Sequence, residues 1–374
     1  MKEHRIEIFL GRVFLAILSL TITFIVVEEV SRLFLTTRSP VEQEFPETNE
    51  MRHPKPYVMF GALPHRRGLN AIGYRGNLPV IPKKPGEFRI FMLGGSTVLL
   101  GNPPIADWLE DEFETAGSPN VKVYNYGVLS SVSGMELTRI VHEISDLEPD
   151  LVIMYNGGND IIVPWESDPR PGYPFNFAVL ESNPLIESTP KSYPAFATFA
   201  YGSNLFRYFL RNYFEEQFIH LNQLRKQTRW KSEGWREKIA DKYVSNVIKA
   251  GKISAAFGAE FIVFFQPMMY FKKHLSADEE AYFNKPGMRE RGEYAQYMRT
   301  RILLKLENVS KTNSLNWLDL SQIYAHKHER IFNDEIHTTD PAKETIAQAM
   351  YEQINKLCAQ QLAAAKSKST RTSR

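Results

Sequence analysis

A serine stands at the end of an apolar segment in the stretch FMLGGSTV, where Ser96 follows Gly94 and Gly95. A serine hydroxyl is a weak nucleophile and reacts only where a neighbouring base takes its proton. The same stretch also fits a phosphate-binding loop or an ordinary turn. No lysine follows the serine as in a P-loop, and the G-x-G-x-x-G pattern is absent. Taken alone, the stretch is most simply a turn, so the rest of the chain must show whether Ser96 has a base.

A candidate base lies close to the C-terminus in FNDEIHTTDP, where Asp334 and His337 are three residues apart. A loop with this spacing can bring the carboxylate back to the imidazole. The carboxylate would then fix the tautomer of His337, and the imidazole would accept the serine proton. The simpler alternative is that Asp334 caps a turn and His337 is a surface residue.

A third stretch, GGND, supplies a side-chain amide, because Asn159 follows an apolar run and two glycines. Such an amide can donate a hydrogen bond to a developing oxyanion, and the backbone N–H groups of Ser96 and Gly127 would complete the oxyanion hole. Thr97, beside the serine, and Gln266, at the end of a later apolar run, are candidate substrate contacts. Asparagine and glycine are also common in turns for backbone reasons, so an ordinary turn remains the alternative.

The elements that must position these residues alternate between strand and helix. Apolar runs predict five strands, and helical spacing predicts four helices, one of them opened by a capping box of Ser133 and Glu136. The strands are expected at 88–95, 121–127, 151–160, 260–267 and 315–321, and the helices at 105–117, 133–150, 238–259 and 340–362. Strands that are apolar on both faces are typical of a parallel sheet covered by helices on both sides. We therefore predict an α/β, flavodoxin-like three-layer sandwich with a five-stranded parallel sheet, which binds ligands beyond the carboxyl ends of its strands.

Taken together, the four stretches resemble the four blocks of the SGNH hydrolase superfamily, also called GDSL-like lipases and esterases. The matching stretches are GGST, NYG, GGND and DEIH, within about 85–170 and 240–355. The resemblance implies a Ser96–His337–Asp334 triad and an oxyanion hole made by Ser96, Gly127 and Asn159. Two positions depart from the family pattern. Gly95 stands where the family name has aspartate, and VLSS follows Gly127 where many members place another glycine.

Composition excludes several classes of function. The chain of 374 residues has 45 Lys and Arg against 43 Asp and Glu, so its net charge of +2 gives no footprint for nucleic acid. Cys358 is the only cysteine, which excludes a disulfide framework within the chain. The stretch HKHER has two histidines but no third ligand nearby, so we expect no metal site and no cofactor.

The N-terminal part differs from the rest of the chain. A helix over about 8–27 would be about 30 Å long, enough to cross a bilayer, and no signal-peptidase pattern follows it. We expect residues 1–38 to form an uncleaved single-pass transmembrane anchor; a cleaved signal peptide and a buried soluble helix are the alternatives. Lys2, Arg5 and Arg12 lie before or near the start of the span, whereas only Arg32 and Arg38 follow it, so the Lys and Arg bias predicts an N-terminus in the cytoplasm and a catalytic domain outside it.

The remaining chain divides by composition. Residues 39–87 are predicted as an extended lead-in, residues 88–362 as the hydrolase-like domain, and residues 363–374 as a disordered basic tail. A helical insertion interrupts the domain at 161–237, with an aromatic, basic helix at 203–230. This helix is expected to pack on the sheet. The alternatives are a cover over the cleft or a helix on a membrane surface.

These observations favour a membrane-anchored serine hydrolase acting on acyl or acetyl esters. One alternative is an O-acetyltransferase or deacetylase acting on an acetylated cell-surface glycan, because the acyl-enzyme chemistry is the same and only the acceptor differs. A second alternative is a catalytically idle binding protein on the same fold. A nucleotide-binding flavodoxin-like protein would leave DEIH without a role.

Overall fold

The computed structural model describes residues 2–35, 49–175, 177–181, 196, 200–210, 213 and 220–372. The chain divides into two compact units, each with many contacts among its own residues. One unit contains Met1–Pro46 with Ala178–Leu224, and the other contains Glu47–Phe177 with Arg225–Arg374. All candidate site residues belong to the second unit, which is described first.

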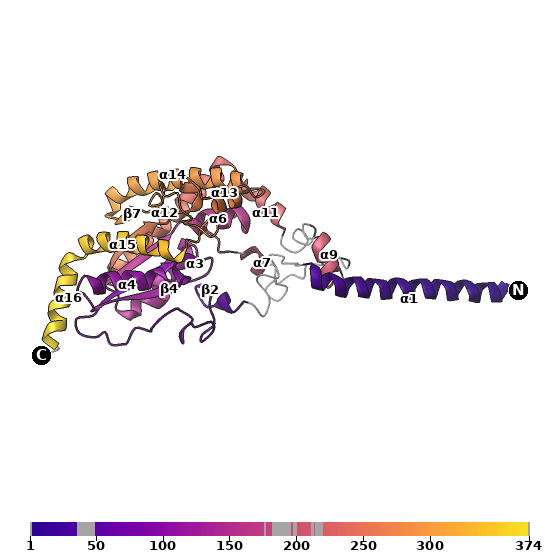
Figure 1. The fold of residues 1–374 in the computed structure, drawn as a ribbon, viewed down its shortest axis with the longest axis horizontal. Coiled ribbons are helices and arrows are strands. Elements are labelled where there is room, and N and C mark those ends of the chain that lie inside the picture. The colour runs from indigo at the N-terminus through magenta and orange to yellow at the C-terminus, as the bar shows by residue number, and fades with distance from the viewer. Residues whose placement is uncertain are drawn as a thin grey trace. The chain divides into compact units, whose positions relative to one another are not determined.

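A five-stranded parallel sheet forms the centre of this unit (Figure 1). Its strand order is β4-β3-β5-β6-β7, which is the flavodoxin-like order. The bounds are β3 Phe88–Gly94, β4 Val121–Gly127, β5 Leu151–Asn156, β6 Glu260–Phe265 and β7 Trp317–Asp319. The predicted five-stranded α/β fold is confirmed. Its strand order reverses beside β3, so the crevice between the ends of β3 and β5 is where such sheets bind ligands.

Helices cover the sheet in two groups. Helix α4 (Ile105–Thr115) packs on β4 and on α15 (Asp340–Leu357), while α12 (Glu233–Ala256) packs on β6, α5 (Ser133–Arg139) and α14 (Met288–Asn313). Right-handed crossovers between parallel strands place such groups on opposite faces of the sheet. The other α-helices that lie within this unit are α3 Ser96–Leu99, α6 Gly158–Glu166, α13 Ala277–Phe283 and α16 Ala359–Thr372. Two short helices, α7 (Phe177–Glu181) and α11 (Leu221–Thr228), span the points along the chain where one unit ends and the other begins.

Helix α5 differs from its prediction in two ways. It continues as a π-helical turn at Ile140–Ile144 and a 3-10 turn at Ser145–Leu147, so one long regular helix over 133–150 is not formed. The predicted capping box is also absent, because the N-cap residue is Val132 and makes no side-chain cap. The side chains of Ser133 and Glu136 are buried instead, and they bond to residues near the end of β5.

The two flanking segments contain more regular structure than predicted. The lead-in includes a 3-10 turn at Asn49–Met51 and a hairpin of β1 (His53–Lys55) and β2 (Met59–Gly61); residues 39–48 lie outside the described part. At the other end, most of the tail expected to be disordered belongs to helix α16. The helix predicted over 340–362 is interrupted at Cys358, which is the C-cap of α15.

The other unit is built around helix α1 (Lys2–Phe34), which includes an apolar span at Ile6–Phe34 long enough to cross a membrane. Near the end of α1, the Glu28 carboxylate accepts hydrogen bonds from Ser203 Oγ and the backbone N–H groups of Asn204 and Leu205. These donors begin helix α9 (Asn204–Phe209). The single helix predicted over 203–230 is therefore wrong in its first part, since α9 ends at Phe209 and packs on α1. Residues 211–212 and 214–219 lie outside the described part.

Candidate active site

Ser96 begins the short helix α3 directly after strand β3. The two glycines before it are needed for space. A Cβ at Gly94 would lie 2.4 Å from the carbonyl oxygen of Tyr155, and a Cβ at Gly95 would lie 2.3 Å from Nδ2 of Asn159. The backbone of Gly95 has a φ of -86°, which any residue can adopt. Glycine is thus required because neighbouring groups approach the backbone closely, and one of those groups is the predicted oxyanion donor.

The loop before α15 brings His337 and Asp334 to the serine. His337 Nε2 lies 2.6 Å from Ser96 Oγ, and His337 Nδ1 lies 2.7 Å from Asp334 Oδ2. The other carboxylate oxygen, Oδ1, accepts the backbone N–H groups of Ile336 and His337 at 2.9 and 2.8 Å. A continuous chain of hydrogen-bonding distances therefore runs from Ser96 Oγ to a carboxylate whose two oxygens both have partners.

The surroundings of Asp334 favour the ionised form of its carboxyl group, which is the form that stabilises a protonated imidazole. Burial would raise the pKa of this carboxyl, but the hydrogen bond from His337, the charge of His337 and the two backbone donors together hold the pKa below its ordinary value. Ser96 is only 8% exposed, and the side chains of His337 and Asp334 are about one-third exposed. Solvent and substrate thus reach the imidazole more easily than the serine.

A second set of contacts fixes the loop that carries Asp334 and His337. The Glu335 carboxylate is bound by Arg291 of α14 at 2.8 and 2.9 Å and also accepts a hydrogen bond from the Tyr270 hydroxyl. The same guanidinium pairs with Glu166 of α6. Arg291 could not be predicted from the sequence, because nothing in a polar helix indicates which loop one of its arginines contacts. Glu335 could have been suspected from its place inside DEIH.

Asn159 lies in the first turn of α6, after the end of β5. Its Nδ2 donates to the carbonyl oxygen of Ser131 at 2.8 Å, and it lies against the backbone of Gly95, next to the serine. An amide nitrogen has two hydrogens, so one is held by Ser131 and the second remains for a ligand. The structure therefore brings Asn159 to Ser96, as the sequence predicted.

Gly127 has a different role from the one predicted. Its backbone N–H donates to Oδ1 of Asn125 at 3.0 Å, so it is not free to bind an oxyanion. Gly127 pairs with Gly94 in the sheet, and a Cβ at this position would lie 2.4 Å from the backbone nitrogen of Leu99. This glycine therefore lets helix α3 approach strand β4, and the prediction that it is an oxyanion donor is corrected.

Of the two predicted substrate contacts, one lines the cavity beside Ser96 and the other does not. Thr97 lines a cavity of about 580 Å³ that opens beside Ser96 and His337, and its Oγ1 has no hydrogen-bond partner among the described residues. Gln266 is buried beneath Gly158 and does not line this cavity, which corrects its assignment as a substrate contact. Most of the residues that line the cavity carry polar side chains; the lining residues are Ser96, Thr97, Leu100, Gly101, Asn102, Asn333, His337, Thr338, Thr339, Asp340, Pro341 and Lys343.

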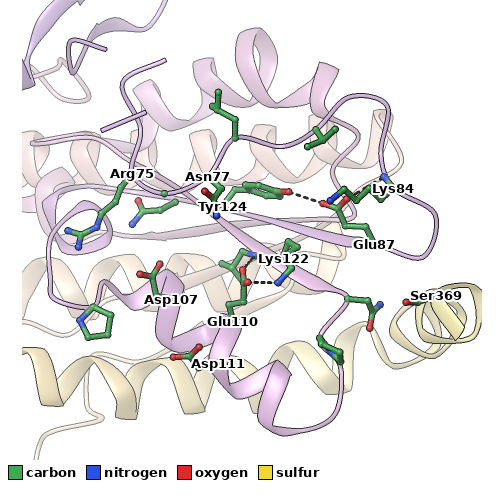
Figure 2. Close-up of a pocket in the computed structure, with 18 of the residues that line it drawn as sticks. Arg75, Asn77, Lys84, Glu87, Asp107, Glu110, Asp111, Lys122, Tyr124 and Ser369 are labelled. Atoms are coloured by element: carbon green, nitrogen blue, oxygen red, sulfur yellow. Dashed lines mark hydrogen bonds and ion pairs between the residues drawn. The ribbon is translucent and has the colours of Figure 1, made fainter. Parts of the chain in front are cut away.

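A larger cavity, of about 980 Å³, lies along the edge strand β4 (Figure 2). Two of its carboxylates are bound by other lining residues. Lys122 Nζ lies 2.6 Å from Glu110 Oε1, and the Tyr124 hydroxyl donates to Glu87 at 2.8 Å. The residues that line this cavity do not include Ser96, Asn159, Asp334 or His337, so the size of a cavity alone does not identify the candidate site.

Comparison with known proteins finds similar solved structures but no related sequence. No protein-family model matches the chain, and no curated protein does. A GDSL-like lipase from Bacteroides thetaiotaomicron is similar at 13% identity over 72% of this chain and 88% of its own, with a TM-score of 0.39. An acetylxylan esterase from Geobacillus stearothermophilus is similar at 9% identity over 71% of this chain and 94% of its own, with a TM-score of 0.40.

Proposed function

We propose that this protein is a serine hydrolase that cleaves ester bonds, with Ser96 as its nucleophile. The observation that carries the proposal is the continuous chain from Ser96 Oγ through His337 to Asp334, with distances of 2.6 and 2.7 Å. A serine, an imidazole and a carboxylate in this arrangement form the constellation that activates a hydroxyl for attack on a carbonyl carbon.

The reaction follows from what each group can do. His337 Nε2 accepts the Ser96 proton as Oγ attacks the ester carbonyl, and Asp334 stabilises the imidazolium that forms. When the tetrahedral intermediate collapses, the imidazolium gives the proton to the leaving alcohol, and the acyl group stays on Ser96. A water molecule then attacks the acyl-enzyme and loses its proton to His337. The bond between the acyl carbon and Ser96 Oγ breaks, His337 returns the proton to Oγ, and the acid is released.

The oxyanion of the intermediate is bound by two donors in this proposal, the free hydrogen of Asn159 Nδ2 and the backbone N–H of Ser96. Support comes from the close approach of Asn159 to Gly95 and from its fixed bond to Ser131. A donor held in place before the reaction begins stabilises the developing charge without reorganisation, and loss of one such donor costs about 10²–10³ in kcat.

The polar side chains that line the 580 Å³ cavity favour an ester whose alcohol portion is hydrophilic. Asn102, Asn333 and Thr97 can hydrogen-bond to a sugar hydroxyl. This observation supports the second candidate, in which the substrate is an acetylated glycan and the protein is a deacetylase or an O-acetyltransferase. The two differ in whether water or a glycan hydroxyl attacks the acyl-enzyme.

Steady-state kinetics on a short acetyl ester, with the full-length protein in detergent, test the proposal. Ser96→Ala is expected to remove all but about 10⁻³ or less of kcat, while Ser145→Ala, a distant exposed serine, serves as the matched control. Added glycans that increase acetyl ester turnover without increasing acetate release would identify a transferase. Full activity of Ser96→Ala would refute the hydrolase assignment.

We also propose that α1 anchors the protein in a membrane with the N-terminus in the cytoplasm. The apolar span at Ile6–Phe34 supports this, together with the basic residues that precede it. Because Cys358 is buried, single cysteines introduced by His4→Cys and Ser145→Cys can report topology. An impermeant maleimide added to intact cells is expected to label Ser145→Cys but not His4→Cys. The opposite labelling would reverse the orientation.

A further inference from the structure

A group of buried polar residues lies directly behind the turn that carries Asn159. The group consists of Ser131, Ser133, Glu136, Asn156 and Asp160, each between 0 and 5% exposed. None of them takes part in the series of hydrogen bonds that joins Ser96 Oγ, His337 and Asp334. Burial of a polar group costs folding free energy unless the group is hydrogen-bonded. The partners of these five residues therefore indicate which segments the group holds in place.

One part of the group holds the residue after Asn159. The Asp160 carboxylate accepts the backbone N–H of Ser133 with both oxygens at 3.1 Å and the Ser133 hydroxyl at 2.5 Å. Asn246 of α12 donates to the same hydroxyl at 3.0 Å. The first turn of α6 is thereby tied to the first turn of α5.

A second part holds the end of strand β5, three residues before Asn159. Glu136 Oε2 accepts a hydrogen bond from Asn156 Nδ2, and the Tyr243 hydroxyl donates to Asn156 Oδ1 at 2.8 Å. Glu136 and Ser133 both belong to α5, so this helix is hydrogen-bonded to the GGND turn on each side of Asn159.

A third part reaches the amide of Asn159 itself. Its Nδ2 donates to the carbonyl of Ser131, and the hydroxyl of Ser131 accepts from Arg139 Nη2 at 2.6 Å. Arg139 also donates to the carbonyl oxygen of Tyr126. The loop before α5 is therefore held by an arginine that lies on the same helix as Glu136.

We propose that Glu136 and Asp160 are positioning residues for the oxyanion donor Asn159, which they hold in place through the turns on either side of it and through the loop at Ser131. This inference rests on the proposed esterase function. It assigns the two buried carboxyl groups to the stabilisation of the transition state, although neither touches the substrate.

The protonation state of Glu136 makes the inference testable. Burial raises the pKa of Glu136 to about 8, although Arg139 lowers it, so the carboxyl group is neutral near pH 7. The titratable groups that face it are Arg139 on its own helix, Asp160 on α6 and Tyr243 on α12. The Ser131 hydroxyl also faces the Glu136 carboxyl and lowers its pKa, and among the described residues Arg139 Nε has no hydrogen-bond partner. When Glu136 ionises, its charge attracts Arg139 away from Ser131, and the carbonyl that holds Asn159 moves.

The test is a set of variants assayed for kcat and KM between pH 6.5 and 9.5. Glu136→Ala is expected to lower kcat about 10-fold or more at neutral pH, with KM within about threefold, because oxyanion contacts act in the transition state. Glu136→Gln reproduces the neutral carboxyl group and is expected to recover most of this loss. Wild-type kcat should decline above about pH 8, and Glu136→Gln should lack that decline.

A double-mutant cycle separates positioning from general loss of structure. In the Asn159→Ala background there is no amide to misplace, so Glu136→Ala should cost less than about threefold more, and the alkaline decline should disappear. An equal loss in both backgrounds, or an alkaline decline that persists in Glu136→Gln, would overturn the inference. If Glu136→Ala does not fold, the pH profiles of Glu136→Gln and Asn159→Ala decide it. Covalent labelling of Ser96 tests the esterase function separately, so the two failures are distinguishable.

Discussion

Arg291 binds both oxygens of the Glu335 carboxylate with a single nitrogen, Nη1, at 2.8 and 2.9 Å, and so connects helix α14 to the loop of Asp334 and His337. Glu335 lies between the two triad residues in the chain, yet its side chain points away from the serine and toward α14. The backbone carbonyl of Glu335 also accepts the N–H of Met269 at 2.9 Å. The position of the imidazole therefore depends on an ion pair formed outside the triad.

Replacement of Arg291 should disturb catalysis without removing any reacting group. Arg291→Met leaves the partly buried Glu335 carboxylate with one donor fewer, and we expect kcat to fall about 10–100-fold and stability to fall by about 2–4 kcal/mol. Arg289→Met, on the same helix but exposed, is the matched control and should stay near wild type. An Arg291→Met protein with unchanged kcat would show that the ion pair does not set the position of His337.

The close contact between Gly95 and Asn159 predicts a sharp effect of one methyl group. A Cβ at residue 95 would lie 2.3 Å from Asn159 Nδ2, so Gly95→Ala must push the amide away from the serine. We expect kcat to fall by about 10²-fold, the cost of one oxyanion donor, with KM little changed. Gly234→Ala is the control, because a Cβ there meets nothing within 4 Å. Equal kinetics for both variants would contradict the placement of Asn159.

The raised pKa of Glu136 also predicts how stability depends on pH. Its ordinary pKa is 4.5 and its folded value is about 8, so between these values the folded protein keeps a proton that the unfolded chain has lost. The free energy of unfolding therefore falls as pH rises through this window, at about 1.4 kcal/mol for each pKa unit. Glu136→Gln cannot titrate and should lack this contribution.

Melting temperatures measured from pH 5 to pH 8 would check the sign. Relative to Glu136→Gln, the wild-type protein should lose about 5–10 °C over this range, since a few kcal/mol shift the midpoint by that much in a domain of this size. Parallel curves for the two proteins would mean that Glu136 is ionised, or equally protonated in both states, throughout the range.

In the unit around α1, Glu28 should be the residue that holds helix α9. Its carboxylate accepts the donors at the start of α9, and it is buried, whereas the neighbouring Glu29 is exposed. Glu28→Gln should increase hydrogen exchange at the amides of Asn204 and Leu205 by about 10-fold or more, because loss of a cap weakens a helix start by about 1–2 kcal/mol. Unchanged exchange relative to Glu29→Gln would argue against the contact.

The sequence allowed the five-stranded parallel sheet and the proximity of Ser96, Asp334, His337 and Asn159 to be predicted, because parallel strands bring their carboxyl ends to one edge. Gly127 was misjudged because a glycine at a strand end does not reveal whether its N–H is already bound, here by Asn125. Gln266 follows β6 as predicted, but its side chain turns under Gly158. The partners Arg291 and Glu335 could not be predicted, since their contact depends on how α14 packs.

The measurement that tests the central claim most directly is covalent labelling of the full-length protein with a fluorophosphonate, followed by mapping of the modified residue. We predict one adduct, on Ser96, that forms near neutral pH and is abolished in His337→Ala, because an imidazole nitrogen 2.6 Å from the Ser96 hydroxyl can accept its proton. Absence of labelling in the folded wild-type protein, or an adduct on another serine, would contradict the account.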